Sequence, residues 1–254
     1  MIDKQRSIDP ATLHVLENAE KAGIETVWDR LAAQKVQCKF GKEGLCCRNC
    51  VMGPCRVNPG GKGAQVGICG ATPEAIVARN LLRHVAAGTS AHSDHGREIV
   101  MALRVAASGE SDAYKIRSPE KLMEMALEYG VECDGRSNNE IAAELADTLL
   151  AEFGKQDGTL VNLKRAPEQQ LKNWEATGTA PRGIDREVVT GLHTTHVGVD
   201  SDAAHILLTA VRTALADGWG GSMIGTDVSD ILFGEPEPLR SQANMGVIKE
   251  NEVN

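Results

Sequence analysis

The sequence predicts an all-α protein with an N-terminal helical arm, a cysteine-rich loop and a helical bundle domain. Helix-start and helix-stop residues recur along most of the chain. No segment alternates apolar and polar residues, with β-branched enrichment, over the length of a strand. Aromatic residues make up only 3% of the chain, so we expect a core of Leu, Ile, Val, Ala and Met.

The arm and the loop are predicted to occupy residues 1–70. Asp9 can cap a first helix that has Pro10 in its first turn and ends near Gly23. A second helix is predicted over residues 24–35. The loop follows directly and holds six of the seven cysteines.

The helical bundle domain is predicted to span residues 71–234, because capping residues, first-turn prolines and terminal glycines recur there. Thr72 opens a helix expected to stop at Gly88, after which Ser90 caps a separate helix over residues 91–109. Further helices are predicted after Ser118, Ser137 and Asp202, and over residues 222–234.

Three segments break the helical pattern, at residues 155–167, 177–183 and 234–241. The third contains two prolines, which end the helical domain. A new element starts after these prolines, and the sequence then stops without a cap. We therefore expect residues 235–254 to be a linker into a missing second domain.

The bulk composition excludes several classes of function. The chain has 254 residues, a formal net charge of −8 and a pI near 5.4, which argues against a nucleic-acid partner. No apolar run approaches the roughly 20 residues of a membrane span, and the N-terminus has no signal-peptide core. We expect a cytoplasmic protein, in which clustered cysteines indicate metal or redox chemistry rather than disulfides.

The cysteine spacing predicts one complete four-thiolate site. The pattern is C-x7-C-C-x2-C-x4-C-x13-C. Four of these cysteines can converge on one centre: Cys47, Cys50, Cys55 and Cys69. Zinc is one alternative, but four-cysteine zinc sites usually have two well-separated short pairs, so the compact spacing favours an iron–sulfur cluster. Arg48 and Arg56 flank these ligands and either offset thiolate charge or are ordinary surface residues.

Cys38 and Cys46 remain outside this site. The planar peptide between Cys46 and Cys47 makes it difficult for both side chains to reach one centre. Two cysteines are half of a four-cysteine site, so a twofold homodimer could complete a second cluster on its axis. The alternative is a pair of structural thiols. Cys133 has no nearby cysteine in the sequence and is expected to be a small apolar core residue.

His92 and His95 lie three residues apart and therefore share one face of the predicted helix. Ile99 and Ala102 continue the same stripe, so this face is expected to be buried. Two interpretations remain open at this point. The histidines are either core residues bonded to neighbouring carbonyls or members of a proton-transfer path. His193 and His196 repeat the spacing, and we expect them to be structural.

The segments CKFGKEGLCCRNCVMGPCR, VGICGA and AGTSAHSDHGRE resemble the N-terminal part of the anaerobic nickel–iron carbon monoxide dehydrogenases. The resemblance covers essentially the whole chain, and it implies a helical domain followed by two α/β domains. It also implies that the ligands of the catalytic Ni–Fe–S cluster, a histidine and several cysteines, lie outside these 254 residues. The chain alone is then expected to be an inactive fragment.

The resemblance implies roles for the cysteines by position. Cys47, Cys50, Cys55 and Cys69 match the ligands of the 4Fe–4S cluster that relays electrons in each subunit. Cys38 and Cys46 match the ligands of a cluster shared across the dimer axis. The seven-residue gap between them resembles the 4Fe–4S form of that shared cluster rather than the 2Fe–2S form.

For His92 the resemblance favours the proton-transfer interpretation, because the matching position in the family lies beside the active cluster. The position of His95 begins a row of proton-carrying histidines in the family. The chain departs from that row at Glu98 and Met101. We assign no role to Asp217, although the resemblance allows it to lie near the active cluster.

The resemblance implies CO and CO₂ as substrates, a homodimer, a ferredoxin-like electron acceptor and acetyl-CoA synthase as a further partner. One alternative is a standalone 4Fe–4S electron-transfer or redox-sensing protein without the catalytic domain. Hybrid-cluster proteins are a weaker alternative, because their cysteine spacing differs from the paired pattern of this chain.

Overall fold

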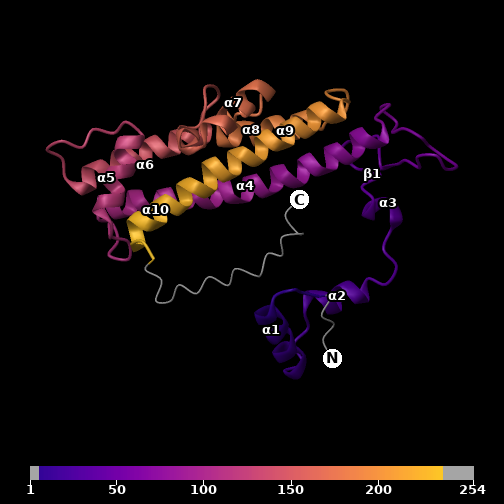
Figure 1. Ribbon diagram of the computed structural model, residues 1–254, viewed down its shortest axis with the longest axis horizontal. Coiled ribbons are helices and arrows are strands. Elements are labelled where there is room, and N and C mark those ends of the chain that lie inside the picture. Colours follow the sequence, from indigo (N-terminus) through magenta and orange to yellow (C-terminus); the bar gives the residue numbers. More distant parts are fainter. Residues whose placement is uncertain (1–5, 237–254) are drawn as a thin grey trace, which may run out of the picture.

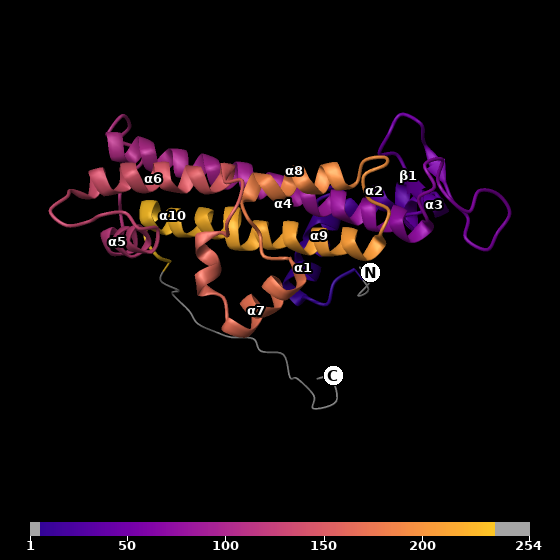
Figure 2. The ribbon, with the colours of Figure 1, turned by 90° about the horizontal axis from the view of Figure 1, so that it is seen from above.

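The fold is built around one long helix, and the computed structural model describes residues 6–236. In chain order the elements are α1 (Pro10–Lys21), α2 (Val27–Ala33), α3 (Lys39–Lys42), β1 (Cys46–Cys47), β2 (Cys55–Arg56), α4 (Pro73–Ser108), α5 (Pro119–Glu128), α6 (Asn138–Gly154), the 3-10 turn η1 (Val161–Arg165), α7 (Glu168–Thr177), α8 (Ile184–Thr194), α9 (Ala203–Ala216), the π-helical turn η2 (Asp217–Ser222) and α10 (Met223–Phe233). The predicted all-α class is confirmed, since the two strands have two residues each. Helix α4 runs along the whole bundle, with α6 and α8 in one row and α9 and α10 in another (Figure 1, Figure 2).

Most predicted helix starts are confirmed by cap hydrogen bonds. The hydroxyl of Thr72 accepts a hydrogen bond from the N–H of Ala75 at 3.3 Å, which begins α4. Ser137, after which a helix was predicted, forms a capping box with Glu140 at the start of α6. The same kind of bond begins three further helices, at Asp9, Ser118 and Asp202. Each cap satisfies N–H groups that have no partner within the helix.

The predicted break between two helices at Gly88 is wrong. Helix α4 continues through Gly88, spans 36 residues from Pro73 to Ser108 and is capped by Gly109, whose φ of 71° suits glycine. Ser90 does not cap a helix, because its hydroxyl donates to the carbonyl of Ala87 at 2.8 Å. A glycine inside a helix costs about 1 kcal/mol relative to alanine. Packing of α4 against several helices at once offsets that cost.

The C-terminal half of the bundle also differs from expectation. No helix was predicted from the sequence where α7 and α8 lie. Helix α9, which begins after Asp202 as predicted, is not separated from the next predicted helix but passes through η2 directly into α10. Trp219 of η2 packs edge-on against Trp174 of α7, with ring centroids 5.7 Å apart. This tertiary contact holds a glycine-rich turn that local propensity alone does not favour.

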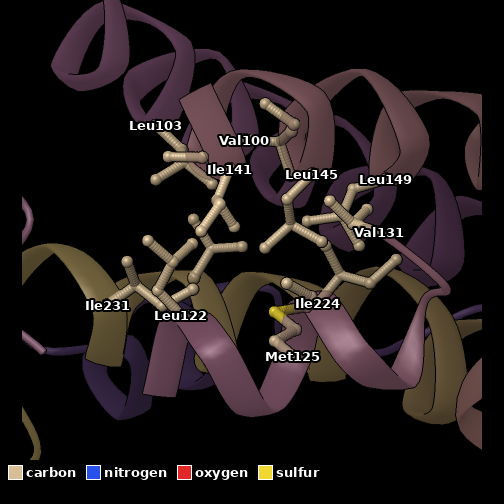
Figure 3. Packing of buried hydrophobic residues seen from close by; sticks show 14 of the residues in the cluster. Val100, Leu103, Leu122, Met125, Val131, Ile141, Leu145, Leu149, Ile224 and Ile231 are labelled. Carbon is tan, nitrogen blue, oxygen red and sulfur yellow. The ribbon is translucent and has the colours of Figure 1, made fainter. Parts of the chain in front are cut away.

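The main apolar core lies where α4, α5, α6 and α10 meet (Figure 3). Val100 and Leu103 of α4 face Leu122 and Met125 of α5 and Ile141 of α6, and all are fully buried. A smaller cluster joins Leu82 of α4 to Ile206 of α9. As the low aromatic content predicts, aliphatic side chains supply nearly all of this core.

The N-terminal arm contrasts with this bundle, and Figure 1 shows α1 and α2 set apart from it. Neither helix contains a buried residue. Several large apolar side chains of the arm are largely exposed, among them Val15 at 65% and Val36 at 95%. The arm therefore gains its helices from caps and local bonds rather than from packing on the bundle.

The predicted boundaries at residues 70 and 234 stay a prediction. Residues 237–254, which include most of the predicted linker 235–254 and the start of a further domain, lie outside the described residues. Between residues 6 and 236, none of the helices combines the length and the apolar character that crossing a bilayer requires.

Candidate metal centre

The cysteine loop folds back on itself as a short antiparallel pairing of β1 with β2. Cys47 lies opposite Cys55, and Cys46 lies opposite Arg56. Adjacent residues of a strand point to opposite faces. The pairing therefore sends the Cys46 and Cys47 side chains to opposite sides of the hairpin. Asn80 of α4 fixes this hairpin to the bundle by donating to the carbonyl oxygens of Gly44 and Cys46, at 2.9 and 3.1 Å.

Four thiols line one cavity between this loop and the start of α4. They belong to Cys47, Cys50, Cys55 and Cys69. Among residues 6–236 no three Cys, His, Asp or Glu side chains are close enough to hold a single metal ion. In a four-iron cluster each of the four thiolates binds a different iron, so four thiols around one cavity match the number of ligands that such a cluster takes.

The backbone around the cavity is shaped for close approach to sulfur. The N–H of Ile68 donates to the Sγ of Cys55 at 3.5 Å. A hydrogen bond from the backbone of Ala71 lowers the pKa of the Cys69 thiol, and Arg79 lowers it further against the opposing effect of burial. Gly53 is tightly enclosed, because a Cβ there would lie 3.2 Å from the Cys47 carbonyl oxygen. Amide donors and a lowered thiol pKa both favour metal ligation by thiolate.

Two buried nitrogen donors at the cavity support an anionic occupant. Among the described residues, the Nδ2 of Asn49 and the Nε of Arg79 are buried and have no hydrogen-bond acceptor. Both residues line the cavity. A buried donor without an acceptor costs about 1–3 kcal/mol. The sulfurs of an iron–sulfur cluster are acceptors, so the donor set and the unpaired nitrogens both fit such a cluster.

Arg48 and Arg56 do not line this cavity, although they flank its cysteines in the sequence. Both are exposed, and the Arg56 guanidinium lies over the ring of Phe40, 5.3 Å from its centroid. The buried arginine at the cavity is Arg79, from the second turn of α4, which the sequence pattern did not indicate. No cysteine motif extends that far, so only the fold reveals it.

The two remaining loop cysteines lie elsewhere. Cys38 is exposed at the start of α3, and Cys46 is half-buried; neither lines the four-thiol cavity. Cys133 is buried in the main core and its thiol donates to the Val131 carbonyl at 3.4 Å. It therefore occupies the place expected of a small apolar residue.

The predicted burial of the His92 and His95 face is wrong. Both residues are exposed, and 59% of the His92 side chain is accessible. The buried stripe of α4 lies one position further along, at Ser93, Gly96 and Val100. The cause is a tertiary contact, because η2 packs against Ser93 and Gly96 and leaves the histidines at its edge.

This packing brings His92 to an acid that the sequence did not assign. The Nδ1 of His92 lies 2.9 Å from the Oδ1 of Asp217, and the hydroxyl of Ser222 donates to the same oxygen at 2.7 Å. His92 and His95 also line a hollow together with residues of η2 and α10. The glycine-rich segment around Asp217 was the available signal, since π-helical turns often occur at functional sites.

Two glycines make this contact possible. A Cβ on Gly96 would lie 2.6 Å from the carbonyl oxygen of Gly221, and a Cβ on Gly221 would lie 3.1 Å from that of His92. The first distance excludes a side chain and the second is a tight contact, so α4 and η2 approach backbone to backbone. Glu98 and Met101 continue the exposed face beyond His95, while His193 and His196 are exposed near the end of α8.

The fold and the site define a helical protein with a loop in which four thiols line one cavity, and comparisons with known proteins identify its family. The model of the Prismane/CO dehydrogenase family matches residues 45–254. Carbon monoxide dehydrogenase 1 of Methanosarcina mazei is 55% identical over 98% of this chain, and carbon monoxide dehydrogenase 1 of Carboxydothermus hydrogenoformans is 41% identical over 100%. The chain spans about 40% of the length of each.

Solved structures give the same result. A nickel-free carbon monoxide dehydrogenase from Thermococcus sp. AM4 superimposes with a TM-score of 0.83 at 51% identity, over 94% of this chain and 38% of its own. An acetyl-CoA synthase/carbon monoxide dehydrogenase structure gives 0.82 at 36% identity, over 92% and 35%. The chain belongs to the Prismane/CO dehydrogenase family, and the resemblance to carbon monoxide dehydrogenases is confirmed.

Proposed function

We propose that this chain is the electron-relay, dimerisation and proton-transfer part of an anaerobic nickel–iron carbon monoxide dehydrogenase. The complete enzyme would catalyse CO + H₂O ⇌ CO₂ + 2H⁺ + 2e⁻. One observation carries the proposal: the four cysteines of the motif surround one cavity in a chain that belongs to this family.

In this proposal the four cavity cysteines, Cys47, Cys50, Cys55 and Cys69, hold a 4Fe–4S cluster. Such a cluster takes up and passes on one electron at a time. The protein fixes its position and its potential. The amide of Ile68 and the guanidinium of Arg79 donate to ligand sulfurs, and Gly53 lets the backbone close over the site.

We propose that Cys38 and Cys46 supply half of a second 4Fe–4S cluster, which a homodimer shares on its axis. Their position outside the four-thiol cavity supports a separate site. The exposed apolar side chains of the arm support a partner surface beside Cys38, because an isolated helix pair rarely leaves such residues in water. A twofold axis would bring the same two cysteines from each subunit.

We propose that His92 and His95 transfer protons, with Asp217 orienting the first of them. A carboxylate at Nδ1 favours the tautomer with hydrogen on that nitrogen, which leaves Nε2 free to accept a proton. Asp217 is fixed in turn by the hydroxyl of Ser222. The exposure of His92 suits a residue that faces a reaction site formed with other parts of the enzyme.

The ligands of the Ni–Fe–S cluster are proposed to lie outside these 254 residues, in agreement with the 40% share of the relatives that the chain spans. A ferredoxin-like protein is the proposed electron acceptor in a cytoplasmic setting. A relative from Moorella thermoacetica is named carbon monoxide dehydrogenase/acetyl-CoA synthase subunit beta, at 36% identity. Acetyl-CoA synthase is therefore a further proposed partner.

Anaerobic purification with metal analysis tests this function. We expect about six iron and six sulfide per chain, about four from the relay cluster and the rest from half of the shared one. A reduced sample should give the electron paramagnetic resonance signal of 4Fe–4S clusters. A colourless, zinc-loaded protein would contradict the proposal. We also expect no CO oxidation by the 254-residue chain, so nickel-dependent turnover would contradict the placement of the catalytic ligands.

A further inference from the structure

Arg79 is an unusual residue for its place in the fold. Only 3% of it is exposed, yet it is an arginine at the wall of the four-thiol cavity. A buried guanidinium normally has a carboxylate beside it, because an unpaired buried charge is costly. Among the described residues, no carboxylate forms an ion pair with Arg79. Its counter-charge has to come from another group.

The contacts of Arg79 point toward the thiols. One Nη donates to the Sγ of Cys69 at 3.8 Å, and the other donates to the backbone carbonyl of Asp200. The Asp200 carboxylate is not free to pair with it. Its Oδ1 accepts from the N–H of Asp202 at 2.8 Å, and its Oδ2 lies 2.5 Å from the Nδ1 of His205. The backbone carbonyl of Asp200 thus orients the Arg79 guanidinium, while the Asp200 carboxylate contacts His205.

The Nε of Arg79 is a third donor at the same cavity, and it is buried without an acceptor. A four-iron cluster with four thiolates is an anion in both oxidation states, and reduction adds one more negative charge. A fixed, desolvated positive charge therefore stabilises the reduced form more than the oxidised form. Hydrogen bonds to ligand sulfur act in the same direction.

We propose that Arg79 sets the reduction potential of the relay cluster, acting as its buried counter-ion through Cys69. This inference rests on the proposed function, because it requires a cluster in the four-thiol cavity. It assigns a positioning and tuning role to a residue of α4 that lies outside the cysteine motif. It also explains why an arginine is kept in the wall of the cavity without a carboxylate partner.

The test is a redox titration of the iron-loaded chain, followed by electron paramagnetic resonance. In Arg79→Gln we expect the ratio of reduced to oxidised relay cluster, at the wild-type midpoint, to fall about tenfold or more. A tenfold change equals a midpoint lower by ~59 mV for one electron. The matched control is Arg56→Gln, which removes the same charge next to Cys55 but from an exposed side chain. Its ratio should change less than about twofold.

A second variant covers the case in which Arg79→Gln loses iron. Arg79→Lys keeps the charge and loses the planar fork, so it should hold the cluster with a ratio lowered by about two- to tenfold. A loaded Arg79→Lys in which the ratio falls by more than about tenfold overturns the inference, because the positive charge is still present. So does a loaded Arg79→Gln that matches the wild type or Arg56→Gln. A wild-type chain without any iron–sulfur cluster overturns the proposed function as well, which separates the two failures.

Discussion

The cysteine loop and the helical bundle differ in the interactions that stabilise them. The loop has a small apolar cluster of Val57, Ala71, Ala75 and Ile76, while its thiols and amides are arranged around a cavity. The bundle has a continuous aliphatic core and buried ion pairs. If the loop holds the proposed cluster, metal binding should contribute to its folding, whereas the bundle is stabilised by its own side chains.

The two regions also differ in how their sites are assembled. All candidate ligands of the loop lie between Cys38 and Cys69, so one short segment contains the whole donor set. The histidine site joins His92 to Asp217, which are 125 residues apart. Changes in the loop should therefore remove metal with little effect on the bundle. Changes in the bundle away from Arg79 should alter stability and the histidine site with little effect on metal content.

The largest expected effect is the loss of the relay cluster. Cys50→Ser should remove about four iron per chain, because one thiolate of the set is gone. Cys38→Ser should remove only half of a shared cluster, about two iron per chain. Iron and sulfide analysis of both variants measures this. If both changes remove the same iron, the division into two sites is wrong.

Next in size is a cavity in the bundle core. Leu145 of α6 is fully buried among the residues of Figure 3, so Leu145→Ala should lower the free energy of unfolding by about 2–5 kcal/mol. Leu127→Ala on α5, where 68% of the side chain is exposed, is the control and should stay within about 0.5 kcal/mol. Denaturant unfolding followed by circular dichroism compares them. Equal losses would contradict the assigned core.

The glycine contact between α4 and η2 should be nearly as sensitive. Gly96→Ala places a methyl group 2.6 Å from the Gly221 carbonyl oxygen, and we expect a loss of about 1–3 kcal/mol. Gly88→Ala is a control on the same helix. Nothing lies within 4 Å of its Cβ, so it should raise stability by about 0.4–1 kcal/mol. A stabilised Gly96→Ala would refute the close contact.

The smallest expected effect concerns a buried acid of the bundle. Burial raises the pKa of Glu187, but hydrogen bonds from Arg182 and the charge of Arg212 outweigh it, so the net pKa is lowered. A lowered folded-state pKa stabilises the protein above the unfolded value of about 4.3, and this contribution is lost as pH falls through the folded-state pKa. Glu187→Gln should therefore cost about 1 kcal/mol at pH 7 and progressively less in acid.

Stability of Glu187→Gln and of the parent chain, measured from pH 7 down to about pH 3, tests this sign. A difference that grows as the pH falls would contradict it. The iron content of the loop should be equal in the two proteins at pH 7. A loss of iron in this variant would show that the two regions are coupled.

Much of the fold could be predicted from the sequence, because helix starts are local. Cap residues such as Thr72 and Ser137 act within one turn, and the structure has the expected bonds. The break at Gly88 and the burial of His92 were predicted wrongly. Both depend on which helices pack against α4, and that information is not contained in a single segment.

The sequence by itself determined the helical class, the family and the order of the candidate ligands, since these depend on neighbouring residues. Which charged groups lie beside the cysteines and His92 depends on the tertiary structure alone. Arg79 reaches the thiols because α4 begins beside the loop, and Asp217 reaches His92 because Gly96 and Gly221 allow backbone contact. Such pairings form between segments distant in the chain, so they follow from packing rather than from any local pattern.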